Sequence, residues 1–152
     1  MAFYNKVLKT SLNTRFKSEA LYSIGSISIE DDKLKEAEAY FWQASEMDPA
    51  FELPYIGLAK AQFMRFFEQV NNDDEDINGN LVGQALQNLV NAININPNKA
   101  MAYYQLALIH KHLGLYSETD RFFQEALAVI PNDISLSKTE KETMINLINN
   151  HY

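Results

Sequence analysis

The densest group of potential metal ligands lies in one acidic stretch near the middle of the chain. There Asp74, Asp76, Asn78 and Asn80 follow the alternating spacing of the first half of an EF-hand calcium loop. Such a loop needs a bidentate glutamate at its twelfth position, which in this chain is Ala85. The pattern therefore favours a solvated acidic loop with an Asn-Gly turn and leaves weak calcium binding as the alternative.

No other set of residues has the types and spacing of a catalytic group. The chain lacks cysteine, which excludes disulfides, thiol catalysis and thiolate metal sites. His110 and His112 point to different faces of a helix, so they cannot readily share a metal ion. A glycine-rich phosphate loop, a nucleophile elbow and an HExxH motif are all missing. The sequence predicts a protein that is not an enzyme and needs no cofactor.

The composition is that of a folded, acidic protein. Hydrophobic residues make up 47% of the 152 residues, and the net charge is −7. These values disfavour disorder and a fold-wide basic surface for nucleic acid. The chain has no apolar stretch long enough to cross a bilayer, and its basic N-terminal segment, residues 1–17, lacks the apolar core of a secretory signal. We therefore expect a cytoplasmic protein that does not insert into membranes.

The spacing of three prolines predicts how the helices of the chain are arranged. Pro97 and Pro131 are 34 residues apart, whereas Pro49 and Pro97 are 48 apart, which is one 34-residue unit with 14 extra residues. Each proline lies five residues after an alanine, and a large apolar residue lies three residues before each alanine. This pattern predicts two antiparallel helices per unit, with small residues where the helices touch and a proline after the second helix.

The apolar spacing also gives the helix ranges. It predicts helices over 19–30, 33–47, 53–70, 81–95, 101–113 and 116–129. Ser137 and Glu140 form a capping-box pattern, which predicts a last helix over 138–149 that covers one open end of the stack. Trp42, next to the apolar Phe41, is expected to pack on a neighbouring element rather than to bind a ligand.

This pattern resembles the tetratricopeptide repeat (TPR), with its 34-residue signature W-x2-L-G-x2-Y…A-x3-F-x2-A…P. The matching segments are 18–51, 52–99 with a 14-residue acidic insertion, and 100–133. The resemblance implies an all-α fold, a TPR superhelix of three helix-turn-helix repeats. A short N-terminal helical segment would precede the repeats, and a C-terminal capping helix within 134–152 would follow them.

TPR proteins hold peptides on a concave groove lined by the first helix of each repeat. The resemblance places the groove at Tyr22, Ser26, Ile29, Leu53, Ile56, Lys60, Phe63, Met101, Tyr104, Leu108 and Lys111. These side chains are mostly apolar or aromatic, which predicts a surface for an extended apolar peptide or for the apolar face of a helix. The open alternative is that the chain fills the groove itself, with its N-terminal segment or as a homodimer.

Many TPR co-chaperones use Lys, Asn and Arg side chains to clamp the terminal carboxylate of a peptide. The corresponding positions in this chain are Tyr22, Ser26, Gly57, Met101 and Gln105. The resemblance therefore implies no clamp and disfavours a co-chaperone of that kind. We expect a non-enzymatic adaptor that binds a protein partner. A small chaperone for secreted proteins and a calcium-responsive regulator acting through residues 73–80 are the alternatives.

Overall fold

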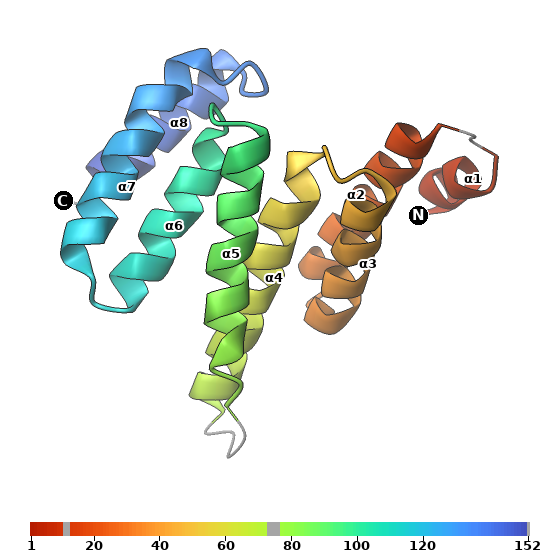
Figure 1. The fold of residues 1–152 in the computed structure, drawn as a ribbon, viewed down its shortest axis with the longest axis horizontal. Coiled ribbons are helices and arrows are strands. Elements are labelled where there is room, and N and C mark those ends of the chain that lie inside the picture. Colours follow the sequence, from red (N-terminus) through yellow and green to blue (C-terminus); the bar gives the residue numbers. More distant parts are fainter. Residues whose placement is uncertain (11–12, 73–76, 152) are drawn as a thin grey trace. The chain divides into compact units, whose positions relative to one another are not determined.

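The computed structural model describes residues 1–10, 13–72 and 77–151, and these residues form helices and loops without a strand. The α-helices are α1 (Ala2–Thr10), α2 (Thr14–Glu30), α3 (Leu34–Met47), α4 (Glu52–Asn71), α5 (Asn80–Ile95), α6 (Ala100–His112), α7 (Tyr116–Val129) and α8 (Lys138–Asn149), and a 3-10 turn, Ile130–Asn132, follows α7 (Figure 1). The predicted all-α fold is confirmed. None of the described helices is long and apolar enough to cross a membrane.

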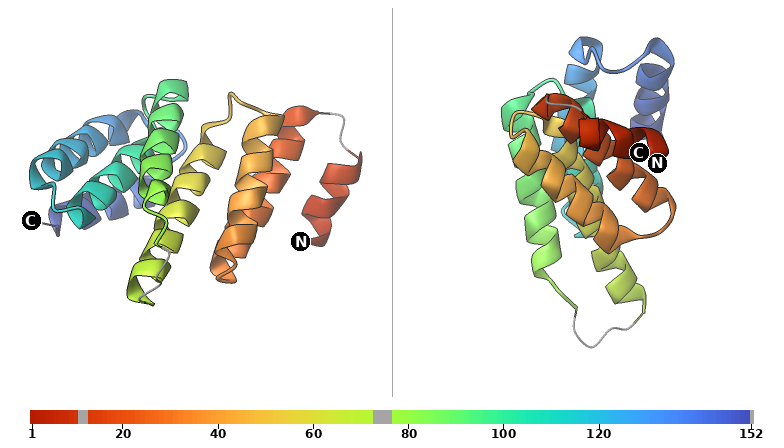
Figure 2. Two further views of the ribbon diagram at one scale, coloured as in Figure 1. Left: turned by 60° about the horizontal axis from the view of Figure 1, so that its bottom comes forward. Right: turned by 90° about the vertical axis from the view of Figure 1, so that its right-hand side faces the viewer.

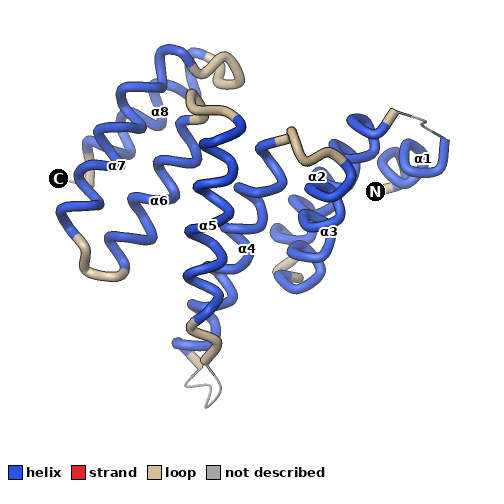
Figure 3. The backbone as a smooth tube through the Cα atoms, in the orientation of Figure 1, coloured by secondary structure: helices blue, strands red, loops and turns tan. Residues whose placement is uncertain are grey.

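The chain divides into two compact units, Met1–Ile95 and Asn96–Tyr152, which we call unit 1 and unit 2. Within each unit, consecutive helices pair along the chain (Figure 3). The predicted helix ranges agree with the structure to within one residue at nearly every end. The exception is α2, which begins at Thr14 rather than at 19. Asn13 explains the earlier start, because its side chain accepts hydrogen bonds from the first backbone amides of this helix, those of Arg15 and Phe16.

The core of unit 1 is organised around one phenylalanine between two glycines. Phe41 of α3 is almost fully buried, with Gly25 of α2 on one side and Gly57 of α4 on the other. A β-carbon added to Gly25 would lie 2.8 Å from the Phe41 ring, and one added to Gly57 would lie 2.7 Å from it. The missing side chains therefore let α2 and α4 both contact α3 closely, and Figure 2 shows these helices side by side.

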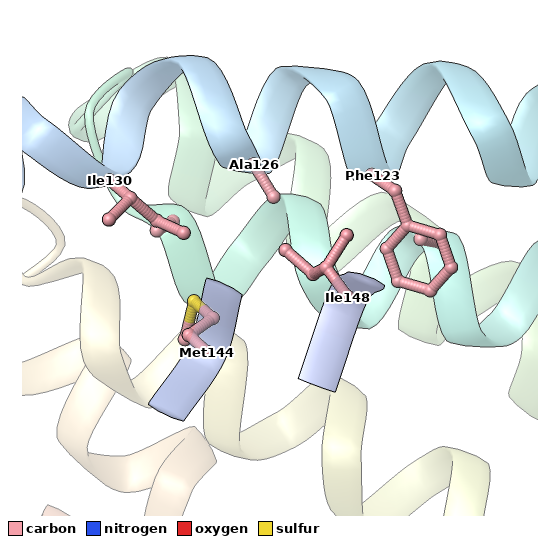
Figure 4. Close-up of a cluster of buried hydrophobic side chains, with 7 residues drawn as sticks. Phe123, Ala126, Ile130, Met144 and Ile148 are labelled. Atoms are coloured by element: carbon pink, nitrogen blue, oxygen red, sulfur yellow. The ribbon is translucent and has the colours of Figure 1, made fainter. Parts of the chain in front are cut away.

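The core of unit 2 repeats this arrangement and adds the last helix. Phe123 of α7 occupies the place that Phe41 has in unit 1, next to Ala107 of α6. Met144 and Ile148 of α8 pack into the same cluster (Figure 4). Ser137 and Glu140 form the predicted capping box at the start of α8. The predicted covering helix is thus present, and its apolar stripe completes the core of this unit.

Candidate functional site

Seven of the predicted groove residues lie on two helices of unit 1. They form what we call the α2/α4 face, which consists of Tyr22, Ser26, Ile29, Leu53, Ile56, Lys60 and Phe63. On each helix these residues are three or four positions apart, so they share one side of that helix. Helices α2 and α4 contact each other. The seven residues therefore lie on two contacting helices of one compact unit, and their role as a binding surface stays a prediction.

The members of the α2/α4 face differ in how much they can offer a ligand. Lys60 is exposed and has no hydrogen bond or ion pair within the described part of the chain. Leu53 and Phe63 are half-buried. Ile56 is only 5% exposed and belongs to the core. Because so little of its side chain is exposed, Ile56 can support the α2/α4 face but offers little area to a ligand.

Tyr22 supports the fold as well as the α2/α4 face. Its ring centroid lies 5.5 Å from that of Phe41 and 5.8 Å from that of Phe51. Burial raises the pKa of Tyr22, a hydrogen bond with Ser26 opposes this shift, and the Glu52 carboxylate adds to it. Tyr22 is therefore partly a core residue. Replacing it would therefore lower stability.

Helix α4 carries an aromatic cluster that sequence analysis identified only in part. The ring of Phe63 meets that of Phe67 edge-on at 4.9 Å and stacks on that of Phe66 at 6.5 Å. All three rings are half-buried. Phe66 and Phe67 follow Phe63 by three and four residues. This spacing could have predicted the cluster, because such residues are neighbours on a helix surface. The cluster extends the α2/α4 face beyond the predicted Phe63.

The predicted groove residues of unit 2 lie on one side of α6. Met101, Tyr104 and Leu108 pack against the core cluster, whereas Lys111 is exposed. His151, which follows α8, contacts two of the four. Its ring centroid is 6.4 Å from that of Tyr104, and its Nδ1 is 2.9 Å from Nζ of Lys111. His151 thus covers part of this surface, a contact that sequence analysis did not predict.

Acid is expected to weaken the His151 contact. Burial lowers the pKa of His151 from 6.5, and the Lys111 ammonium lowers it further. Because the folded-state pKa lies below the unfolded value, the unfolded chain binds this proton more readily. The stability contributed by neutral His151 is then present above pH 6.5 and is lost as the pH falls below it. An NMR titration should give a pKa below 6.5 in the native chain and a value closer to 6.5 in Lys111→Gln. A native His151 that titrates at or above 6.5 would contradict this prediction.

The weak metal candidates are only partly described. Asp74 and Asp76 lie outside the described residues, whereas the side chain of Asn78 accepts a hydrogen bond from the amide of Asn80 at 3.1 Å. Ala85, at the twelfth loop position, is fully buried in α5. Among the described residues, no three His, Asp or Glu side chains are grouped as metal ligands would be. Calcium binding stays a prediction.

One of the clamp positions has no space for a side chain. A β-carbon at Gly57 would lie 2.7 Å from the ring of Phe41. Any polar side chain there would have to displace a buried aromatic ring. The close approach of α4 to α3 is therefore incompatible with a clamp residue at this position.

The helix pairs, the small residues at their contacts and the 34-residue spacing place the chain in the class of α-helical repeat proteins. The family model for the tetratricopeptide repeat matches residues 18–51 and 100–133. The chain is a TPR protein. The stretch between the two matches contains the acidic insertion. A search of curated protein sequences finds no match.

Several solved structures superpose on the chain, and TPR domains are among them. The TPR domain of Arabidopsis OM64 does so with a TM-score of 0.64 and 18% identity, over 92% of this chain and 100% of that one. The second TPR of Spaghetti (RPAP3), bound to the HSP90 peptide SRMEEVD, superposes with a TM-score of 0.62 and 15% identity, over 76% of this chain and 94% of that one. The Yersinia enterocolitica type III secretion translocator chaperone SycD superposes with a TM-score of 0.63 and 15% identity, over 88% of this chain and 92% of that one. At these identities the similarity is one of fold.

Proposed function

We propose that the chain is a non-enzymatic adaptor that binds an apolar segment of a partner protein on its α2/α4 face. One observation carries this proposal. The exposed Lys60 lies on α4 one helical turn before the half-buried Phe63, whose ring contacts those of Phe66 and Phe67. Aromatic side chains dominate the energetics of protein interfaces, and a neighbouring cation adds selectivity for a partner with an acidic residue. The TPR fold, which serves protein–protein interaction, supports the same assignment.

The spacing of the aromatic cluster suits a short segment in either of two conformations. Ring centroids 4.9 Å and 6.5 Å apart can contact successive side chains of an amphipathic helix or alternate side chains of an extended peptide. Met101, Tyr104, Leu108 and Lys111 of α6 form a separate candidate surface within unit 2. A segment that binds Tyr104 or Lys111 would have to compete with His151.

Selection from a random-peptide phage library on the immobilised full chain tests this proposal. We expect enrichment of one motif with apolar residues two to four positions apart and an acidic residue at its edge. Phe63→Ala should abolish the enrichment, while circular dichroism confirms that the variant is folded. Enrichment of many unrelated apolar sequences would favour the chaperone alternative. Enrichment no greater than on empty support would contradict both.

A further inference from the structure

A recess lies on the side of helix α4 that is opposite to the α2/α4 face. Leu58, Gln62 and Arg65 are four and three residues apart and therefore share one side of α4, whereas Lys60 points away from them. A pocket of about 590 Å³ lies over these residues, between α3 and α5. We call it the Trp42 pocket, and its main lining residues are Lys35, Ala39, Trp42, Gln43, Leu58 and Asn88. All of them belong to unit 1.

A chain of polar contacts fixes one wall of the Trp42 pocket. The side-chain amide of Asn88 donates to the carbonyl oxygen of Gln62 at 3.0 Å, and the Gln62 amide donates to Glu38 at 3.3 Å. Arg65 forms an ion pair with the other carboxylate oxygen of Glu38. These contacts link α3, α4 and α5, and they neutralise the charge of Glu38. The wall is therefore ordered before any ligand binds.

Trp42 was expected to pack on a neighbouring element, but its side chain is 57% exposed. Beside it lies the buried aliphatic side chain of Leu58, which forms an apolar floor. The indole N–H of Trp42, the ammonium of Lys35 and the amide of Gln43 have no partner among the described residues. The pocket thus combines an exposed aromatic ring with three unused hydrogen-bond donors.

The charge of the pocket selects the kind of ligand. Its charged lining residues are Lys35, Arg65 and Glu38, which sum to +1. Helix α5, which forms one rim, contains no charged residue at all. Residues 1–17 carry four basic residues and no acid, so the remaining residues, 18–152, carry −11 in total. A local positive charge in an acidic body attracts an acidic ligand and repels a basic one.

We propose that the Trp42 pocket binds a short segment of a second protein in which an acidic side chain adjoins a proline or an aromatic residue. The ring of that residue stacks on Trp42 and covers Leu58, while the carboxylate pairs with Lys35. Gln43 and the indole N–H donate to backbone carbonyls of the segment. Exposed tryptophans of this kind are frequent anchors of protein interfaces. Because the pocket and the α2/α4 face occupy opposite sides of α4, an adaptor could bind two partners at once.

Trp42 is the single tryptophan of the chain, so its fluorescence reports on this pocket directly. The full chain is titrated with a terminally blocked peptide that contains a Glu-Pro-Phe-Glu core. We expect a saturable change in Trp42 emission. A peptide with lysine in place of both glutamates, and the variant Lys35→Glu with the original peptide, should each bind about tenfold more weakly, because an attractive charge pair becomes repulsive.

Lys60→Glu is the matched control, because it makes the same charge reversal at another exposed lysine of unit 1. It should leave the titration unchanged. Equal weakening by Lys60→Glu and Lys35→Glu would place the peptide elsewhere and overturn this inference without affecting the proposal for the α2/α4 face. Three other results would also overturn it. They are the absence of an emission change at millimolar peptide, tighter binding of the lysine peptide, and an emission change on dilution of the chain alone, which would indicate that a second copy of the chain occupies the pocket.

Discussion

Gly57→Ala is expected to destabilise unit 1 by about 2 kcal/mol. Alanine normally stabilises a helix interior by about 1 kcal/mol relative to glycine. At Gly57, however, the new methyl group would lie 2.7 Å from two ring atoms of Phe41. The ring has little room to move aside, because Gly25 of α2 also packs so closely on it that a β-carbon there would lie 2.8 Å from the ring. Overpacking of a rigid core costs about 3 kcal/mol at its upper range, which outweighs the gain in helix propensity.

Gly83→Ala is the matched control for this substitution, because Gly83 is also within a helix but is exposed. The nearest atom to its added β-carbon is Oδ1 of Asn80, at 3.7 Å. This variant should be stabilised by about 0.5–1 kcal/mol in urea unfolding. Adding Phe41→Leu should reduce the cost of Gly57→Ala, since the two side chains share one space. Equal stabilisation by Gly57→Ala and Gly83→Ala would show that Phe41 does not lie between the glycines.

Asp133→Ala is expected to destabilise unit 2 by about 3 kcal/mol. The Asp133 side chain is 2% exposed, and it accepts a hydrogen bond from the amide of Ala100, the first residue of α6, at 3.0 Å. It also accepts from the amide and the hydroxyl of Ser135. Ser135 in turn accepts from the ammonium of Lys99, which is 5% exposed. Removing the carboxylate leaves the buried amide of Ala100 without its acceptor. It also removes the contacts that hold Ser135, the partner of the buried Lys99 ammonium.

Hydrogen exchange of the α6 and α7 amides measures this effect within unit 2. Asp120→Ala removes an exposed carboxylate from α7 and should change the protection by less than about 0.5 kcal/mol. Asp133→Asn keeps an acceptor oxygen and should cost less than Asp133→Ala. Similar protection in Asp133→Ala and Asp120→Ala would mean that the network around Asp133 does not support the start of α6.

The sequence predicted the elements of this fold better than the surfaces they present. The 34-residue spacing and the apolar period locate the helices because each helix needs one buried stripe. Whether a particular residue of that stripe is exposed depends on how closely the neighbouring helix approaches. Gly57 brings α4 close to α3, whereas Ile56, predicted to line a groove, is only 5% exposed. The position of a residue within the repeat does not specify how closely the neighbouring helices approach each other.

The contacts of polar side chains were also not predictable from the sequence. Gln62 replaces the consensus tyrosine of its repeat, and in the sequence it is only a departure from the pattern. In the structure it joins Asn88 to Glu38 and orders the wall of a pocket. His151 stacks on Phe123 at 5.0 Å, although the two are far apart in the chain. Such contacts depend on side-chain conformations and long-range packing, which periodicity does not specify.

The most direct test of the proposed adaptor function is the affinity of the best selected peptide for the native chain and for Lys60→Glu, measured by calorimetry. Lys60 is exposed and has no partner in the described structure, so its replacement should leave the unfolding transition unchanged. We predict binding about tenfold weaker in Lys60→Glu, and unchanged binding in Lys35→Glu. Equal affinity for the native chain and Lys60→Glu would contradict the assignment of the binding surface to the α2/α4 face.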